Sequence, residues 1–126
     1  MVQSTGWCTD GPLRVGVVGV GVMGSNHARV FADLPGVTLV GVADPDGKQR
    51  DFVSRALGCP EFGGVKPLLA AGVDAVTIAA PTHLHRELAF CCIERGVHVL
   101  VEKPIAPSVE EGRAIIAAAR QAGVAL

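Results

Sequence analysis

The segment Gly19-Val20-Gly21-Val22-Met23-Gly24, which we call the glycine turn, constrains the fold more than any other feature of the sequence. It follows a Val- and Gly-rich run at 14–20, typical of a strand buried on both faces, and leads into a stretch at 23–33 that can be helical. In such a strand–turn–helix unit, Gly19 allows a tight turn, Gly21 lets the backbone approach a pyrophosphate, and Gly24 lets the helix pack close to the strand. Free amide groups and the positive dipole end at the helix start favour phosphates. The segment therefore predicts a dinucleotide-binding turn.

Strands and helices are expected to alternate along the rest of the chain. Buried strands are predicted at 37–43, 74–80 and 98–101, with a short strand at 61–62. Helices are predicted at 46–57, 66–71, 83–95 and 108–121, the first and last capped by Asp46 and Ser108, and the third with an apolar stripe at Leu84, Leu88, Cys91 and Cys92. Residues 124–126 look like the start of one more strand. The sequence thus predicts an α/β fold, a doubly wound parallel sheet of the Rossmann type whose last strand is truncated.

Length and charge limit the class of protein. A chain of 126 residues fits one domain, and its formal charge of −1 gives no electrostatic reason to expect nucleic acid or an anionic membrane surface as a partner. No apolar run approaches the roughly 18–20 residues that span a bilayer. Residues 1–12 lack the features of a signal peptide, so we expect a flexible leader before a domain at 13–126, in the cytoplasm. The cysteines lack C-x-x-C spacing, which favours free thiols over a metal or redox role: Cys8, Cys59, Cys91 and Cys92.

An acidic residue at the end of the second strand indicates which dinucleotide binds. Asp44 lies about 20 residues after Gly24, where a carboxylate can accept hydrogen bonds from both adenosine ribose hydroxyls. The same charge repels a 2′-phosphate, and Asp46 adds negative charge nearby. The sequence therefore favours NAD over NADP, although Lys48 or Arg50 could reach a phosphate. The alternative for Asp44 is a simple helix cap.

Two more polar turns are expected beside the glycine turn, at the ligand edge of the sheet. They are Ala80-Pro81-Thr82-His83-Leu84-His85 and Val101-Glu102-Lys103-Pro104. His83 and His85 lack the i, i+4 spacing of helical zinc ligands and have no supporting Cys or acidic cluster, so we predict no metal. Helix capping or packing and a cofactor contact remain open for His85, as an ordinary solvated lysine does for Lys103.

Together these motifs resemble the N-terminal domain of the Gfo/Idh/MocA oxidoreductases, the glucose–fructose oxidoreductase and inositol dehydrogenase family. The matching segments are GVGVMGSNHARVF, VADPD, APTHLH and VEKPIA, which occur in the family order over almost all of residues 13–126. The G-x-M-G-x-N-H-x-R variant further resembles members that act on nucleotide sugars, such as the UDP-N-acetylglucosamine 3-dehydrogenases. Members move a hydride between a sugar or polyol carbon and C4 of the nicotinamide.

The resemblance assigns roles to the predicted site residues. The pyrophosphate would lie at the start of the helix that Gly24 allows to pack close to the strand, and would be lined by Gly19, Val20, Gly21, Val22 and Met23. Asp44 would hold the adenosine ribose. Ala80, Pro81, Thr82 and His85 would run beneath the nicotinamide half, and Glu102 and Lys103 would hold its ribose and carboxamide. Lys103 would also lie near the reacting hydroxyl, where a cation stabilises a developing alkoxide.

Family members continue into a C-terminal domain that carries the substrate pocket and a catalytic histidine, and neither occurs in residues 1–126. We therefore expect this chain to bind a dinucleotide without family-like turnover, and to self-associate through an unpaired sheet edge. A sugar or polyol would bind only to a full-length protein. The alternatives are a stand-alone NAD-binding or redox-sensing module and another Rossmann protein such as a methyltransferase.

Overall fold

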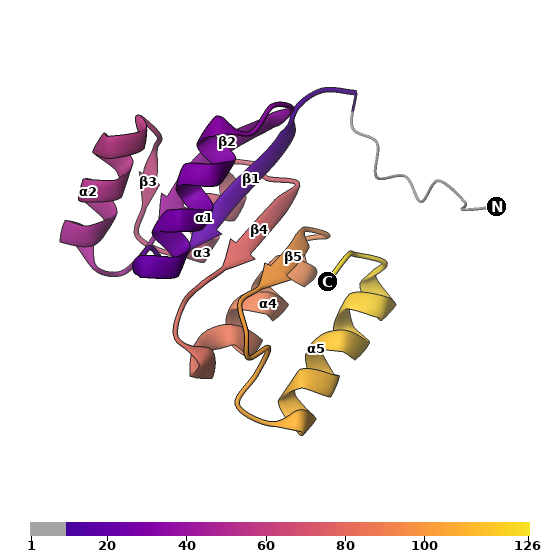
Figure 1. Cartoon of the computed structure of the whole chain (residues 1–126). Helices are drawn as coiled ribbons and strands as arrows, with labels where there is room; N and C mark the ends of the chain where they lie inside the picture. The colour runs from indigo at the N-terminus through magenta and orange to yellow at the C-terminus, as the bar shows by residue number, and fades with distance from the viewer. Residues whose placement is uncertain (1–9) are drawn as a thin grey trace.

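The structure is a computed structural model that describes residues 10–126. Its centre is a sheet of five parallel strands in the order β3-β2-β1-β4-β5 (Figure 1). The strands are β1 (Leu13–Val18), β2 (Val37–Ala43), β3 (Glu61–Phe62), β4 (Ala75–Ile78) and β5 (His98–Val101). Most of the predicted leader, with Cys8, lies outside the described residues. The strand order reverses between β1 and β4, the point beyond which such sheets bind their ligands.

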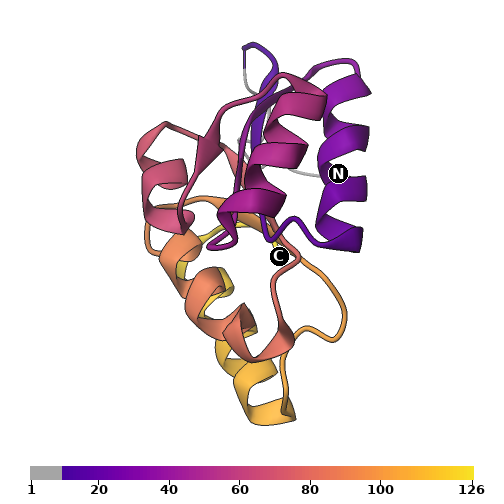
Figure 2. The ribbon, with the colours of Figure 1, turned by 90° about the vertical axis from the view of Figure 1, so that its left-hand side faces the viewer.

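Helices cover both faces of this sheet. On one face lie α1 (Val22–Asp33) and α2 (Gly47–Leu57); on the other lie α3 (Val65–Ala70), α4 (His85–Ile93) and α5 (Val109–Ala122) (Figure 2). A short 3-10 helix, η1 (Thr82–Leu84), leads into α4. None of the helices in the described part of the chain is long and apolar enough to cross a bilayer. The arrangement confirms the predicted doubly wound Rossmann-type fold.

Local residue chemistry sets the ends of two helices as the sequence predicts. Asp46 and Ser108 cap α2 and α5 by accepting hydrogen bonds from backbone N–H groups of the first turn. Gly58 and Gly123 end the same helices with φ of 66° and 70°, a left-handed conformation that favours glycine.

The ends of several predicted elements are wrong in detail, among them the strand predicted at 74–80, which is β4 at Ala75–Ile78. Two of these differences bear on the site. β1 ends at Val18 rather than Val20, because Gly19 adopts a φ of 89° that cannot continue a strand. The helix predicted from His83 begins instead at His85, because residues 82–84 form η1. The buried side of α4 therefore differs in part from the predicted stripe. Its buried residues are His85, Ala89, Cys92 and Ile93, so of the predicted stripe Leu84, Leu88, Cys91 and Cys92 only Cys92 is fully buried.

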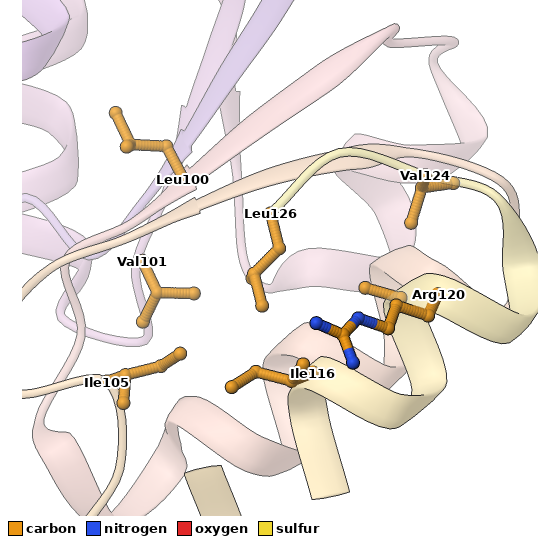
Figure 3. Close-up of a pocket in the computed structure, with 8 residues that line it drawn as sticks. Leu100, Val101, Ile105, Ile116, Arg120, Val124 and Leu126 are labelled. Atoms are coloured by element: carbon orange, nitrogen blue, oxygen red, sulfur yellow. The ribbon is translucent and has the colours of Figure 1, made fainter. Parts of the chain in front are cut away.

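The end of the chain lies beside the outer edge of β5. Residues 124–126 do not form the predicted strand, but the Ala125 carbonyl accepts a hydrogen bond from the Val99 N–H at 3.0 Å. Between β5 and α5 is an apolar groove of about 480 Å³, into which Ile105, Ile116 and Leu126 point (Figure 3). The groove is lined by Leu100, Val101, Ile105, Ile116, Ala119, Arg120, Val124 and Leu126.

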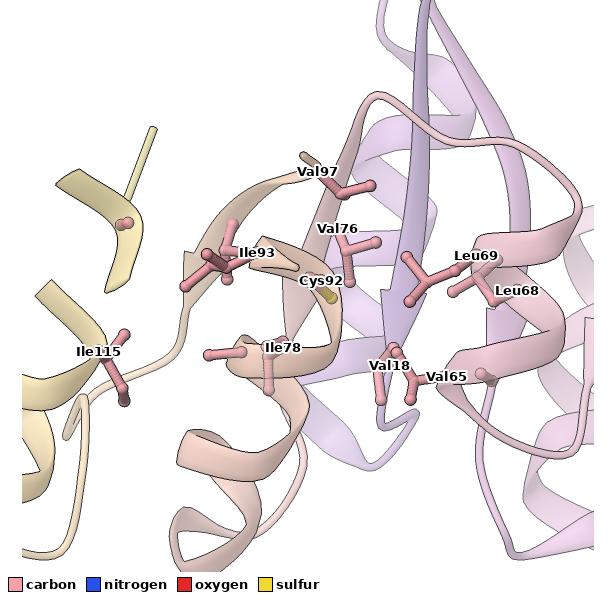
Figure 4. Close-up of a cluster of buried hydrophobic side chains, with 14 of the residues drawn as sticks. Val18, Val65, Leu68, Leu69, Val76, Ile78, Cys92, Ile93, Val97 and Ile115 are labelled. Atoms are coloured by element: carbon pink, nitrogen blue, oxygen red, sulfur yellow. The ribbon is translucent and has the colours of Figure 1, made fainter. Parts of the chain in front are cut away.

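Buried apolar side chains form one cluster on each face. The larger cluster packs the sheet against α3, α4 and α5 (Figure 4), and its Leu68, Ile78 and Ile115 are 0% exposed. Burying one such side chain contributes about 1.5–3 kcal/mol. The smaller cluster joins the sheet to α1 and α2 through Val17, Val20, Ala28, Val42 and Val53. Together the two clusters fix the strands so that their carboxyl ends meet at one edge.

Candidate dinucleotide site

The glycine turn packs directly against the chain that leaves β4. The N–H of Gly19 donates to the carbonyl of Ala43, at the end of β2. The N–H of Ala79, just after β4, donates to the carbonyl of Val18, at the end of β1, and both distances are 2.8 Å. A Cβ added to Gly19 would lie 2.5 Å from the Ala80 nitrogen. The predicted pyrophosphate turn and the predicted nicotinamide turn are therefore in contact, and a side chain at Gly19 would separate them.

Gly24 allows the first turn of α1 to touch the glycine turn itself. A Cβ at Gly24 would collide with the carbonyl oxygen of Gly19 and lie 3.3 Å from the Ala79 side chain. Backbone cannot move aside as the end of a flexible side chain can. This close approach of helix and strand agrees with the packing role that the sequence assigns to Gly24.

Gly21 differs from both, because the space beside it is open. A Cβ built there meets nothing within 4 Å, and Gly21 is the N-terminal cap of α1. The first turn of α1 carries no acidic side chain, and its first N–H groups have no carbonyl one turn earlier to bond. Val22 and Met23, which follow, are 81% and 51% exposed. Open space, free donors and no competing carboxylate are what a bound pyrophosphate requires.

Asp44 lies beside the glycine turn and is fixed by backbone. Its Oδ2 accepts a hydrogen bond from the Val20 N–H at 2.9 Å, and its Oδ1 accepts one from the Asp46 N–H at 2.8 Å. A carboxylate has about four acceptor positions, so the group retains capacity for ribose hydroxyls. Gln49 adds a further tie, because its Nε2 donates to the Val20 carbonyl at 2.8 Å.

The two cations near Asp44 differ in their freedom to reach a ligand. Arg50 donates from Nη1 to the Asp44 backbone carbonyl at 2.8 Å, and its Nε lies 3.5 Å from Glu61 Oε1. Lys48 is exposed, at the start of α2. Arg50 is therefore held beneath the turn by protein groups, and Lys48 is the more mobile cation.

His85 is 1% exposed and bridges two turns. Its Nε2 is 2.8 Å from the Ala80 carbonyl oxygen, and its Nδ1 is 3.0 Å from that of Pro104 and 3.2 Å from that of Ile105. Both ring nitrogens thus face backbone carbonyls. The proposed contact of His85 with a cofactor stays a prediction, whereas its packing between the turns is a property of the fold.

The residues Glu102–Ile105, which we call the lysine turn, follow β5. Glu102 Oε1 is 2.7 Å from Nε2 of His27 on α1, and Glu102 Oε2 accepts the Lys103 N–H at 3.1 Å. The hydrogen bond from His27 lowers the pKa of Glu102. Desolvation acts in the opposite direction, and the Lys103 N–H and the charges of both residues lower the pKa further. The Lys103 side chain is exposed, and the Lys103–Pro104 peptide is cis. Lys103 therefore stands at the same edge as the glycine turn.

Sequence reasoning missed His27. The structure brings it to Glu102, 75 residues further along the chain. Its position in the first helix gives no sign of that partner, because only the packing of α1 beside the end of β5 creates the contact.

The remaining titratable groups give no second centre. Within residues 10–126 no three His, Cys, Asp or Glu side chains come together as metal ligands would. Cys59, Cys91 and Cys92 are free thiols. Burial, with a smaller effect of Cys91, raises the pKa of Cys92 to about 12, so little of this thiol ionises near neutrality. The apolar groove beside β5 contains none of the predicted site residues.

A glycine turn after β1, an acidic residue after β2 and this strand order define a Rossmann-type dinucleotide-binding domain. The comparison with protein families is more specific. A model described as "Oxidoreductase family, NAD-binding Rossmann fold" matches residues 13–126. The chain belongs to this family, the Gfo/Idh/MocA oxidoreductases, and is an NAD-binding domain of it.

Similar proteins include dehydrogenases named for inositol and for nucleotide sugars. The chain is 40% identical over 114 residues to inositol 2-dehydrogenase 4 of Saccharopolyspora erythraea, covering 88% of this chain and 34% of that protein. It superposes with a TM-score of 0.84 on UDP-N-acetylglucosamine 3-dehydrogenase of Acidithiobacillus ferrooxidans, with 38% identity over 89% of this chain and 36% of that one. The WlbA dehydrogenase of Bordetella pertussis, solved with NADH and UDP-GlcNAcA, gives a TM-score of 0.84 and 32% identity over 90% and 35% of the two chains. The chain thus spans about a third of the length of the relatives it matches.

Proposed function

We propose that the chain is the cofactor-binding part of an oxidoreductase that moves a hydride between a nicotinamide dinucleotide and a hydroxyl-bearing carbon of a sugar, polyol or nucleotide sugar. One observation carries this proposal: the glycine turn and the lysine turn lie at the same sheet edge. The 2.7 Å contact between His27 and Glu102 joins α1, which starts at the glycine turn, to the lysine turn. A dinucleotide placed with its pyrophosphate at Gly21 would extend toward Lys103.

In this arrangement the protein residues divide the work. The glycine turn holds the pyrophosphate and Asp44 the adenosine ribose. The segment Ala80–His85 lies beneath the nicotinamide half, and Glu102 accepts hydrogen bonds from its ribose. When bound, the nicotinamide supplies the carbon that exchanges the hydride. The exposed Lys103 ammonium stabilises negative charge on the reacting oxygen, which favours loss of the hydroxyl proton.

We infer a preference for NAD over NADP. A 2′-phosphate on the ribose would bring charge to the Asp44 carboxylate, which two backbone N–H groups hold in place. The cation best suited to bind that phosphate, Arg50, is engaged by the Asp44 carbonyl and lies near Glu61. Lys48 alone is a weak substitute, because its charge is mobile and exposed.

Calorimetric titration of the 126-residue chain with NAD⁺ and NADP⁺ tests this function. We expect tighter binding of NAD⁺, and we expect Asp44→Asn to weaken it about tenfold while narrowing the preference, since a charged hydrogen bond contributes about 1.5–3 kcal/mol. Asp46→Asn is the matched control, because Asn also caps helices and Asp46 lies two residues away. Binding of neither dinucleotide, or an Asp44→Asn variant indistinguishable from the control, would refute the proposal.

Turnover is proposed to require more than residues 13–126. The relatives are about three times as long as this chain, and the family resemblance places the substrate pocket and the catalytic histidine in their C-terminal part. The 126-residue chain is therefore expected to bind NAD⁺ without oxidising inositols or nucleotide sugars. The proposed compartment is the cytoplasm, which the free thiols at Cys59, Cys91 and Cys92 support.

Self-association is proposed through the groove beside β5. Glu102 N–H donates to β4, so the alternate residues Val99 and Val101 direct their backbone groups outward, and Val99 already bonds Ala125. Sedimentation over a range of concentrations should show dimers that Ile116→Arg abolishes and Phe52→Arg, an exposed position on α2, does not. A monomer at every concentration would exclude this interface.

A further inference from the structure

The lysine turn is contacted from two sides by histidines that belong to different helices. His27 reaches Glu102 from α1, and His85 reaches Pro104 and Ile105 from the start of α4. Between these contacts stands Lys103, whose side chain is exposed. The peptide segment that carries the proposed cation is therefore fixed on both flanks by side chains that are not part of it.

The contact of His85 is buried and directional. A carbonyl oxygen accepts hydrogen bonds and cannot donate them, and a neutral imidazole carries one N–H. The tautomer with the proton on Nδ1 donates toward Pro104 and Ile105, and the tautomer with the proton on Nε2 donates toward Ala80. The ring is 1% exposed, which leaves water little access to replace these bonds. Removing the donor would therefore leave a carbonyl of the lysine turn without this protein partner. His85 thus ties the lysine turn to the chain that leaves β4.

The contact of His27 acts through a second hydrogen bond. Glu102 uses one carboxylate oxygen for the His27 ring at 2.7 Å and the other for the N–H of Lys103 at 3.1 Å. The side chains of His27 and Glu102 are 22% and 21% exposed, so solvent reaches the pair in part. The orientation of the Glu102 carboxylate, and with it the backbone of Lys103, depends on His27.

We propose that His27 and His85 are positioning residues that together hold the lysine turn, and hence Lys103, against the nicotinamide end of the site. Neither histidine needs to touch the reacting atoms. The inference rests on the proposed function, because it assumes that a dinucleotide places its nicotinamide at Lys103. It assigns His27 a role beyond its helix and gives His85 a role in place of direct contact with the cofactor.

Conservative variants of each histidine keep or remove one hydrogen bond at a time. The amide nitrogen of Gln matches the position of Nε2 in histidine, and that of Asn matches Nδ1. His27→Gln should therefore keep the bond to Glu102, whereas His27→Asn should lose it. At the buried position the order reverses: His85→Asn keeps the donor toward Pro104 and Ile105, and His85→Gln keeps only the donor toward Ala80.

The readout is calorimetric affinity of the 126-residue chain for NAD⁺ and for ADP, which lacks both the nicotinamide and the ribose that Glu102 would hold. We expect His27→Asn and His85→Gln to weaken NAD⁺ binding about fivefold or more, with little change for ADP, as the loss of about 1 kcal/mol predicts. The rescuing variants His27→Gln and His85→Asn should stay closer to the wild type. In the weakened variants the Lys103 amide should also exchange faster with solvent hydrogen.

Three results would overturn the inference. The first is wild-type affinity for NAD⁺ in His27→Asn and His85→Gln. The second is an equal loss of NAD⁺ and ADP binding, which would mean that the histidines support the fold in general. If the His85 variants do not fold, the two variants of the partly exposed His27 decide. The third is a wild-type chain that binds neither ligand, which would refute the proposed function and the inference that rests on it.

Discussion

The glycine turn and the lysine turn lie at one sheet edge, yet they are held in different ways. The glycine turn is shaped by the absence of side chains: Gly19 and Gly24 leave room for backbone to touch backbone. The lysine turn is shaped by the presence of side chains, because His27 and His85 reach it from α1 and α4. Six consecutive residues determine the glycine turn, whereas the lysine turn depends on packing between distant parts of the chain.

The two turns should also differ in how well they tolerate substitution. At Gly24 an added methyl group has no space, so substitution should destabilise the fold. At Glu102 a substitution changes one hydrogen-bonded side chain that is partly exposed, so the fold should survive and the placement of Lys103 should change.

The largest expected effect breaks the glycine turn. Gly24→Ala should destabilise the chain by about 3 kcal/mol or more, because its Cβ would collide with the Gly19 carbonyl and overpacking against backbone cannot relax easily. Thermal unfolding followed by circular dichroism measures the loss. A variant with the wild-type midpoint would mean that the contact between α1 and the glycine turn is looser than the structure indicates.

A second variant separates fold from ligand in the same turn. Gly21→Ala should leave the unfolding midpoint nearly unchanged, because nothing lies within 4 Å of the new Cβ and the φ of −68° suits any residue. It should weaken NAD⁺ binding about tenfold, or about 1.4 kcal/mol, by filling the space that a pyrophosphate would approach. Unchanged affinity with unchanged stability would place the phosphates elsewhere.

The smallest effect tests the lysine turn through its acid response. The pKa of Glu102 is lowered chiefly by the hydrogen bond with His27, so this contact stabilises the fold above the ordinary carboxyl range and loses its contribution as pH falls through the lowered value. Glu102→Gln should therefore lower the midpoint most near neutral pH and progressively less below about pH 4. Thermal unfolding from acid to neutral pH checks this, with the exposed Glu94→Gln as control. A difference that is the same at every pH would contradict the assigned electrostatic origin.

The contrast between local patterns and distant contacts decides which features the sequence alone predicts. The strand–turn–helix unit, Asp44 beside it and the doubly wound sheet are encoded in local patterns, because glycine geometry and apolar runs act over a few residues. The family resemblance added the roles of Glu102 and Lys103, which spacing alone would have left as ordinary polar residues.

The rest depended on tertiary packing. The pairing of His27 with Glu102 spans 75 residues and has no signature in either segment. The apolar stripe expected on α4 is confirmed only in part. Cys92 is buried and Leu88 and Cys91 pack against the core, whereas Leu84 belongs to η1 and His85 takes a fully buried position. A polar residue at a fully buried position is also what a simple hydrophobic pattern fails to anticipate.

The strand order has a consequence for the chain while it is being synthesised. β1 is synthesised first, and its neighbour β2 follows directly after α1, but its other neighbour, β4, begins only at Ala75, which pairs with Val15. Until that segment leaves the ribosome, one edge of the central strand of the sheet has no partner, and Val17 and Val18 have only part of their final cover. A nascent chain stalled before β4 is therefore a species that chaperones should recognise through β1.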